Sequence, residues 1–564
     1  MRFSFKPQAI AGLLGVAILL VILVMGAQAR PGGAGTQTTG QTYVEAMIGS
    51  PRLVNPLLAS SDTDLDLTHL VYSGLSRVDT QGKIVPDLAS GWTVSADSTV
   101  FTFTLKPNLH WQDGTPLTVS DAAFTIGLLQ SADFPGDPAL AVPWRGVEMT
   151  ATTGSALVLR LPVPNASFVQ YTTLGILPRH LWESVKPSEI AKSQLNVSPV
   201  GSGPWRYAQI SLPASQVEGA ATVTATVQNV ATPVAGGVLL IPNSFAPPAK
   251  GQIDRIWFRP YPTFGAALTG LKLGEVQGLG HIPAESLAEV KALPGVSIHT
   301  QNLARYSMLI LNLDSPLFDK VETRRAFAIA LNRDALADEK NGVSVPLDSP
   351  ILPHSWASNA TCSVAPPYNR TQAAKLLDEA GWKLAAGGIR ARDGVTMTVV
   401  VAANSDVAAN VQTAQGIVDD LRAVGVDARL AAVGRDVFLR DYLGPRAFHV
   451  ALAGWEASGV DPDVFSYWHS SQAVTGGLNF AGWRNAAADK ALEAARSTAS
   501  VEARGPLYCD FARAFISDVP AVVLSTPLYN YATIAPAQGV TLPDADMLSP
   551  ASRFDTIEGW SLHE

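Results

Sequence analysis

Short alternating runs of apolar and polar side chains recur along the chain, and stretches with helical spacing follow them. The segment FTFTLK, residues 101–106, alternates as a half-buried strand does. After the turn signal Asp113-Gly114, Thr118 stands three residues before Asp121, the spacing of a capping box, and apolar residues then recur at helical spacing. The pattern therefore predicts a strand, a turn and a capped helix.

The same order of elements returns further along the chain. A strand is predicted to end near Asn312. Asp319 and Glu322 are predicted to cap the helix that follows, and its apolar face is predicted to extend through Leu331 to Ala335.

A further helix is predicted in NRTQAAKLLDEAGW, with Asn369 as its N-cap and Gly381 in the left-handed conformation at its end. A strand at 397–403, a helix at 411–425 and a strand at 426–433 follow. Because strands and helices interleave through both halves, the fold class is predicted as α/β rather than all-β or a helical bundle.

The most apolar segment is at the N-terminus. Arg2 and Lys6 precede an uncharged run that leads into AQA, residues 27–29, and the tract PGGAGTQTTG follows. The small residues fit cleavage by signal peptidase, and the run is long enough to cross a bilayer at ~1.5 Å per residue. Residues 9–29 are therefore either a long signal peptide or an uncleaved anchor in the cytoplasmic membrane. Both interpretations predict an extracytoplasmic body, periplasmic or at the cell surface.

Composition limits the class of protein. The chain has 564 residues, is 47% hydrophobic and 16% charged, and has a net charge of −8. This length is enough for about two to four domains. Without a basic run, no nucleic-acid partner is predicted. The tract 209–237, rich in Ala, Val and Thr, is predicted as an additional hairpin or loop.

Motifs for catalysis or metal binding are missing from the sequence. It contains no G-x-S-x-G, P-loop, C-x-x-C or H-E-x-x-H pattern, and its nine histidines are scattered. No enzyme activity, catalytic residue, metal site or cofactor is therefore predicted. The two cysteines, Cys362 and Cys509, either pair or stay free, and the sequence leaves this open.

Aromatic residues gather in AGWEASGVDPDVFSYW, residues 453–468, around Gly, Pro and three acids. Such a segment either forms the wall of a ligand cleft or packs against a core as a loop.

Nine segments in a fixed order extend this picture. They are LVYSGLSRVDTQGKIVPDLASGW, FTFTLKPNLHWQDGTPLTVSDAAFT, ILPRHLWE, PVGSGPWRY, IDRIWFRPYPT with LKLGEVQ, LNLDSPLFDKVETRRAFAIALNRDAL, NRTQAAKLLDEAGW, FHVALAGWEASGVDP and GLNFAGWRNAAADKAL. In this order the chain resembles the extracellular solute-binding proteins of family 5, the oligopeptide- and dipeptide-binding type that serves ABC importers. The resemblance covers roughly Tyr43 to Leu528.

The resemblance implies a fold like the type II periplasmic binding proteins, with two hinged lobes and an extra small domain. Ligand binding would close the hinge and create the shape that a permease recognises. The implied parts are a signal peptide or anchor with a linker (1–41), a discontinuous lobe I (42–90, 200–303 and 525–564), an extra domain II (91–199) and a lobe III (304–524).

The resemblance also implies a binding site. In similar proteins the Gly-Trp loop lines the cleft, and Trp455 matches that tryptophan. Peptide-binding members place an Asp for the ligand's α-amino group where this chain has Ser458, and some place an Arg where it has Leu452. A neutral hydroxyl does not replace the charge-assisted bond of a carboxylate.

Other residues are candidates for the missing anchors. Asp461 is close in the same loop, Asp62 lies in the segment that resembles the cleft-edge strand, and Arg435 can supply positive charge. Tyr306 and Asn479 are candidate liners of the cleft. For each of the five, the alternative is a structural or solvated side chain.

The predicted function is capture of a peptide or peptide-like solute outside the membrane and delivery to ABC permease subunits. The alternative is a membrane-anchored receptor or chaperone-like binder of a non-peptide solute on the same fold. Linkage to permease and ATPase genes separates the two, because they do not differ in their residues.

Overall fold

The computed structural model describes residues 41–151, 155–212, 223–226, 236–247, 251–338, 341–362 and 364–563. The predicted signal peptide or anchor, residues 9–29, lies outside the described residues. Within them, no helix has both the length and the apolar character needed to cross a bilayer. Residues 41–564 form one compact unit by themselves.

A large mixed sheet runs through this unit and has thirteen strands within the described residues. Its first half contains β1 (Gln41–Ile48), β8 (Trp205–Leu212), β9 (Val223–Thr226), β10 (Gly237–Pro242), β11 (Ile253–Tyr261), β12 (Gly278–Leu279) and β13 (Val296–Asn302). Its second half contains β14 (Arg305–Leu311), β15 (Ser344–Pro346), β19 (Thr398–Asn404), β20 (Asp427–Val433) and β21 (Val450–Glu456). The remaining strand, β22 (Ala521–Ile534), belongs to both halves.

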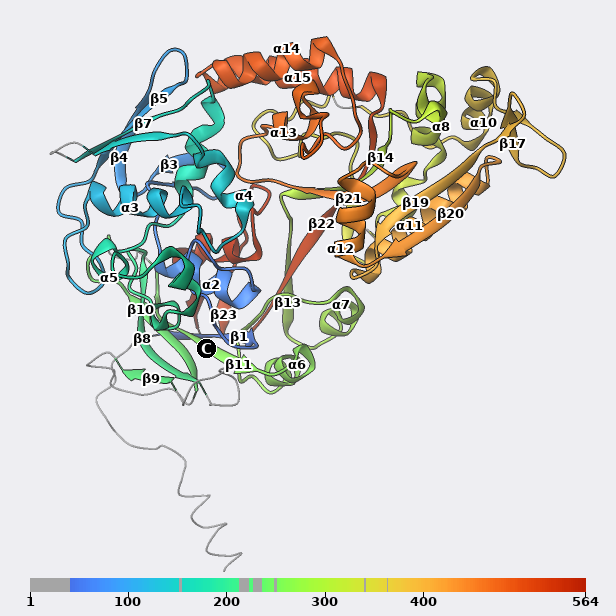
Figure 1. The fold of residues 1–564 in the computed structure, drawn as a ribbon. Coiled ribbons are helices and arrows are strands. Elements are labelled where there is room, and N and C mark those ends of the chain that lie inside the picture. The colour runs from blue at the N-terminus through green and yellow to red at the C-terminus, as the bar shows by residue number, and fades with distance from the viewer. Residues whose placement is uncertain are drawn as a thin grey trace, which may run out of the picture. The chain divides into compact units, whose positions relative to one another are not determined.

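β22 joins the two halves of the sheet. Its residues 521–525 pair with β14 and its residues 528–534 pair with β13, both antiparallel. The chain crosses a second time between β13 and β14. There the hydroxyl of Thr526 donates to the carbonyl oxygens of Leu303 (3.0 Å) and Arg305 (2.8 Å). Figure 1 shows β22 as the long strand that leads from β14 toward β1.

These two crossings divide the unit. We call residues 41–302 and 528–563 the first lobe, and residues 305–525 the second lobe.

The first lobe adds a small antiparallel sheet to its half of the large one. The small sheet has the order β4 (Ala89–Val94), β5 (Val100–Leu105), β7 (Ala156–Arg160), β6 (Glu148–Ala151), and β5 confirms the predicted strand. One buried cluster contains both Phe101 of this sheet and Tyr43 of β1. The division of this lobe into a lobe I and a domain II stays a prediction.

The helices of the first lobe include α2 (Asp62–Val71), α3 (Val119–Leu129), the 3₁₀ helix η2 (Ala166–Thr173), α6 (Phe264–Lys272) and α7 (Ala284–Lys291). The capping box of α3 is confirmed: Thr118 Oγ1 accepts from the N–H of Ser120 (3.3 Å), and the N–H of Thr118 donates to Asp121 (2.8 Å). In the tract 209–237, β9 pairs antiparallel with β8, which confirms a hairpin for the part that the structure describes.

The second lobe is a sheet with helices on both faces. They are α8 (Val321–Ala330), α9 (Arg333–Leu336), α10 (Arg370–Glu379), α11 (Ala408–Arg422), α12 (Arg435–Val437), α13 (Phe465–Trp468), α14 (Ala486–Ser497) and α15 (Val501–Asp518). Leu309 and Leu311 of β14 belong to the core on the side of α8, α10 and α11, and Tyr306, Met308 and Ile310 belong to the core on the side of α13 to α15. This alternation is the period of two expected of a strand.

Several predictions for the second lobe are confirmed. Asn369 accepts from the N–H of Gln372 (2.9 Å) to cap α10, and Gly381 ends the helix with a φ of 95°. The predicted strand, helix and strand between 397 and 433 are β19, α11 and β20. The α/β fold class is confirmed.

One helix prediction was wrong. No side chain caps α8, and Asp319 pairs with Arg392 (3.1 Å) instead. The helix ends at Ala330, because Asn332 donates its N–H to Asp420 (2.9 Å) and starts the separate helix α9 by accepting from the N–H of Ala335 (3.2 Å).

The two cysteines form a disulfide. Cys362 and Cys509 have their Cα atoms 5.3 Å apart, which ties the loop before α10 to α15.

Candidate functional site

Trp455 and Tyr306 lie side by side on neighbouring strands. They are direct partners in the register of β21 and β14, and their rings stack with centroids 4.9 Å apart. Tyr467 meets the Trp455 ring edge-on at 6.2 Å. Trp455 is 6% exposed and Tyr306 2%, so the pair packs into the core at the end of β21. The indole N–H of Trp455 is buried and has no partner among the described residues.

Asp461 lies in a buried network of charged and hydroxyl groups. The guanidinium of Arg504 binds both of its oxygens, at 2.6 and 2.7 Å. Ser167 Oγ donates to the carboxylate (2.8 Å), and the Tyr508 hydroxyl does so at 3.2 Å. Burial alone would lower the pKa of Arg504, but Asp461 raises it above its usual value. The carboxylate is thus bound on both oxygens within the protein.

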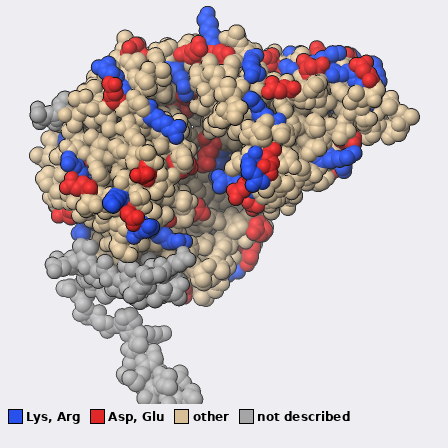
Figure 2. Space-filling model, viewed as in Figure 1, with Lys and Arg blue, Asp and Glu red and all other residues tan. Residues whose placement is uncertain are grey.

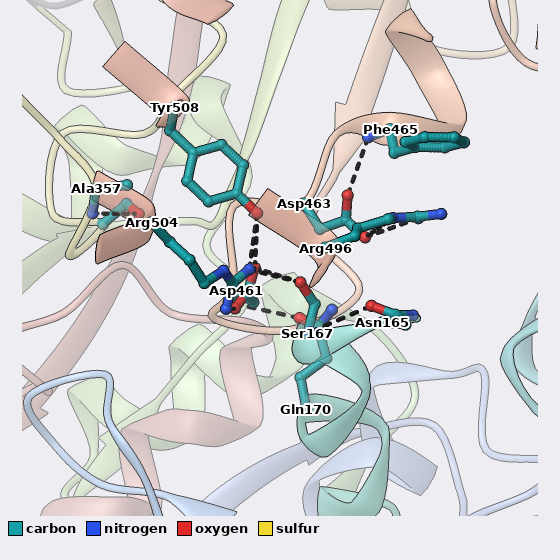
Figure 3. A network of polar contacts seen from close by, with 11 residues as sticks. Asn165, Ser167, Gln170, Ala357, Asp461, Asp463, Phe465, Arg496, Arg504 and Tyr508 are labelled. Atoms are coloured by element: carbon teal, nitrogen blue, oxygen red, sulfur yellow. Dashed lines mark hydrogen bonds and ion pairs between the residues drawn. The ribbon is translucent and has the colours of Figure 1, made fainter. Parts of the chain in front are cut away.

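This network joins segments that are far apart in the sequence. Asp461 and Arg504 belong to the second lobe, whereas Ser167 and Gln170 lie on η2 of the first lobe. The N–H of Asp461 donates to Gln170 Oε1 at 3.2 Å. Figure 3 shows Asp461 between the ribbon segment that carries Ser167 and Gln170 and the side chains of Arg504 and Tyr508.

Ser458 lies on the exposed side of the same loop, three residues before Asp461. Burial raises the pKa of Tyr171, which also belongs to η2, to about 12, and the nearby Ser458 hydroxyl acts in the opposite direction. The ring of Tyr171 packs edge-on against Phe168 at 6.0 Å. Ser458 and Asp461 therefore meet the same helix of the first lobe.

Asp62 lies in the first turn of the helix α2, so the resemblance of its segment to a cleft-edge strand was wrong at this residue. Its carboxylate is 61% exposed and contacts His281 Nδ1 at 2.9 Å. The other ring nitrogen of His281 lies 3.6 Å from Asp66. Burial lowers the pKa of His281, but the two aspartates outweigh it and raise the pKa to about 9. The hydrogen bond from His281 lowers the pKa of Asp62.

A buried charge cluster lies beneath this pair. Arg553 binds Asp66 (2.6 Å) and Glu45 (2.9 Å), and Tyr531 donates to Glu45 (2.6 Å). Burial raises the pKa of Glu45 in spite of Arg553. Sequence reasoning did not find this cluster, since its members come from four distant segments and form no local motif.

The other predicted residues are not part of these groups. Asn479 is fully buried, and its amide bonds the backbone N–H and carbonyl of Trp483 (3.1 and 2.9 Å) within its own loop. Arg435 is exposed at the start of α12, where its N–H donates to Asp406 (3.0 Å). Leu452 is 3% exposed, in the core on the side of α11.

The surface also has concave regions. Figure 2 shows a hollow near the centre of the face seen in Figure 1, with acidic and basic side chains at its rim. A separate cavity of about 440 Å³ lies in the second lobe between Arg333, Asp348 and Tyr368. Among the described residues, no three His, Cys, Asp or Glu side chains are arranged to hold a metal ion.

Comparisons with known proteins agree with this architecture. The model of "Bacterial extracellular solute-binding proteins, family 5 Middle" matches residues 83–477. The chain is 24% identical over 502 residues to the oligopeptide-binding protein AppA of Bacillus subtilis, which covers 88% of each chain.

Solved structures share the fold. AppA of B. subtilis in complex with a nonapeptide superimposes with a TM-score of 0.66 at 22% identity, covering 93% of this chain and 99% of that one. HbpA2 of Haemophilus parasuis superimposes with a TM-score of 0.76 at 20% identity, covering 93% and 100%. NikZ of Campylobacter jejuni in complex with Ni(L-His) does so at 0.66 and 23% identity, covering 92% and 99%. The predicted fold of the type II periplasmic binding proteins is confirmed.

Proposed function

The chain belongs to the bacterial extracellular solute-binding proteins of family 5, and from this we propose that it captures peptides or peptide-like solutes outside the cytoplasm. It delivers them to the permease subunits of an ABC importer. The observation that carries the proposal is the family match over residues 83–477, on a body in which the chain crosses between two lobes at β22 and between β13 and β14. Such a connection lets lobes rotate as units about a few backbone positions.

The peptide part of the proposal is supported by the relatives. AppA is named as an oligopeptide-binding protein, and another relative, 22% identical over 485 residues, is named as di/tripeptide-binding protein 1 of Pseudomonas aeruginosa. These relatives are named for binding, so we propose capture and release without catalysis.

A membrane-anchored receptor or chaperone-like binder of a non-peptide solute is the second candidate. It is supported by Ser458 and Leu452, two neutral residues at positions where the family resemblance implies an Asp in peptide binders and an Arg in some of them. NikZ, of the same fold, was solved with Ni(L-His).

The N-terminal residues 9–29 direct export in both candidates, as a cleaved signal peptide or as an anchor in the cytoplasmic membrane. The mass of the mature protein, measured on membrane and soluble fractions, distinguishes the two.

The ligand is tested by mass spectrometry. Protein purified from its own host is denatured, and the released small molecules are sequenced or identified. Peptides are expected. A single non-peptide solute at one equivalent would contradict peptide capture and support the second candidate. Loss of uptake of the released molecule after deletion of the neighbouring permease genes tests delivery.

A further inference from the structure

The two lobes meet away from the crossing strands at one buried polar contact. From the first lobe, η2 presents Ser167 and Gln170, and the helix is fixed to its own core because Phe168 packs against Trp144 (5.1 Å) and Phe101 (5.4 Å). From the second lobe, Asp461 and Arg504 meet it.

The two sides of this contact differ in how many of their hydrogen bonds they make within their own lobe. Asp461, Arg504 and Tyr508 bind one another within the second lobe, with 2.6–3.2 Å between their polar atoms. The guanidinium also lies over the ring of Trp356 at 5.1 Å. This half of the contact is therefore held in position without the first lobe.

The first lobe adds three hydrogen bonds to that preassembled half. Ser167 Oγ donates to Asp461 (2.8 Å) and accepts from Arg504 (2.7 Å), and Gln170 accepts from the N–H of Asp461 (3.2 Å). The approach is close, because a Cβ added to Gly459 would overlap the side chain of Gln170. A residue other than glycine there would push η2 away.

Another contact between the lobes lies beside the crossing strands. His354 pairs with Asp546 at 2.6 Å, next to Met547, whose carbonyl accepts from the N–H of Ala304 (2.8 Å). Rotation of the lobes would take place about the two crossings of the chain. Because the His354–Asp546 pair lies beside them, we expect it to move little when the lobes rotate. The contact of η2 instead joins the loop after β21 to a helix of the first lobe that lies outside the large sheet, and we expect it to break when the lobes open.

We propose that Asp461 and Arg504 form a clasp that η2 engages when the lobes close, and that Ser167 and Gln170 set how strongly any ligand is retained without touching it. Arg504 is then a positioning residue for the loop that carries Ser458. The inference rests on the proposed function, since closure over a ligand is what the clasp regulates. When a ligand binds only to the closed state, its apparent affinity falls in proportion to the population of that state. The clasp therefore changes the affinity for all ligands by one common factor.

Ser167→Ala is the variant of choice. Removing Asp461 would leave the charge of Arg504 buried and unpaired, and the protein could fail to fold for that reason alone. Ser167→Ala leaves the pair intact and keeps the acceptor of the Asp461 N–H on Gln170. Ser193→Ala is the matched control, because its hydroxyl accepts from the N–H of Leu195 (3.3 Å) within the first lobe.

Affinity is measured by calorimetry for three probes, the tri-, penta- and nonapeptides of alanine with free termini. Ser167→Ala is expected to weaken all three by the same factor, about tenfold, as for loss of a hydrogen bond to a charged partner. Ser193→Ala is expected to change none. A loss that varies among the peptides, or no loss, would overturn the clasp.

Hydrogen exchange of the Asp461 amide is the second measurement and needs no ligand. Faster exchange in Ser167→Ala than in the wild type supports the clasp, and equal exchange overturns it. If none of the peptides binds the wild type, peptide capture has failed, and this measurement alone decides on the clasp.

Discussion

Asp461 and Asp62 are both carboxylates named from the sequence, but their surroundings differ completely. Asp461 is bound on both oxygens by Arg504, 43 residues away, and by Ser167, 294 residues away. The Asp62 carboxylate is 61% exposed and contacts His281. Neither set of partners forms a local pattern. The sequence therefore identified both acids as candidates but could not show which of them is already bound within the protein. Of the two, we therefore propose Asp62 as the anchor for a ligand cation.

Ser458→Asp tests whether the loop lacks an anchor for an amine. The wild type has a neutral hydroxyl there, near Tyr171. We expect N-acetylated and free peptides to bind it about equally. The new carboxylate should favour free amines by ~1.5–3 kcal/mol, the range of a charge-assisted hydrogen bond. Calorimetric titration with one peptide, free and blocked, measures this. A strong preference of the wild type for the free amine would contradict it and would point to Asp62.

His281 predicts a pH dependence of stability. Its pKa in the folded protein is raised to about 9, from an ordinary 6.5, by Asp62 and Asp66 against the effect of burial. The stabilisation is therefore complete below pH 6.5 and is lost as the pH rises through 9. It amounts to roughly 3 kcal/mol, since one pKa unit is ~1.4 kcal/mol. Denaturant unfolding between pH 6 and 10 should show this fall, and His281→Gln should flatten it.

The control is His110→Gln, because His110 contacts the Asn108 carbonyl (2.9 Å) and no carboxylate among the described residues. If this variant and His281→Gln had the same pH profile of the free energy of unfolding, the pairing of His281 with the aspartates would not be the cause of the pH dependence.

Helices and strands whose signals are local were predicted well. The capping box at Thr118, the Asn369 cap and the Gly381 stop each depend on residues within a few positions. The end of α8 was missed because Asp420, 88 residues away, binds the N–H of Asn332. The candidate site was predicted less well than the fold for the same reason. Trp455 and Tyr306 were named separately, and only strand register brings them together.

The disulfide gives a prediction for α15. Its two cysteines are 147 residues apart and almost fully buried, so the link restricts a long loop of the unfolded chain. Cys362→Ala with Cys509→Ala should lower the free energy of unfolding by roughly 2–5 kcal/mol. Chemical denaturation followed by circular dichroism measures it. Wild-type protein unfolded with reductant should match the double variant, and unchanged unfolding in both would count against a stabilising link.

At the scale of the molecule, each lobe has its own hydrophobic core, and the two lobes share one large sheet. The first lobe is built around the cluster of Tyr43 and Phe101, and the second around the two faces of β14. The predicted lobe boundary near residues 303 and 525 and the finer division of the first lobe both stay predictions. The crossings of the chain at β22 and between β13 and β14 lie beside the first of them.

Truncation tests whether the body folds without its N-terminal segment. A chain that begins at Gln41 keeps every described strand and should be soluble and melt cooperatively. A matched chain that begins at Gly49 loses β1, the partner of both β11 and β12, and should not fold. Differential scanning calorimetry compares the two. Insolubility of the first chain would mean that the body depends on residues before Gln41.

The position of β22 in the sequence has a consequence for synthesis and export. A chain that emerges N-terminus first has β1 and β14 long before residues 521–534, yet neither half of the sheet is complete until that strand arrives. Pairing across so long a stretch is slow, because the loop must close before the contacts form. The sheet therefore stays incomplete, and the chain able to pass unfolded through a narrow translocation channel, until residues 521–534 have been made.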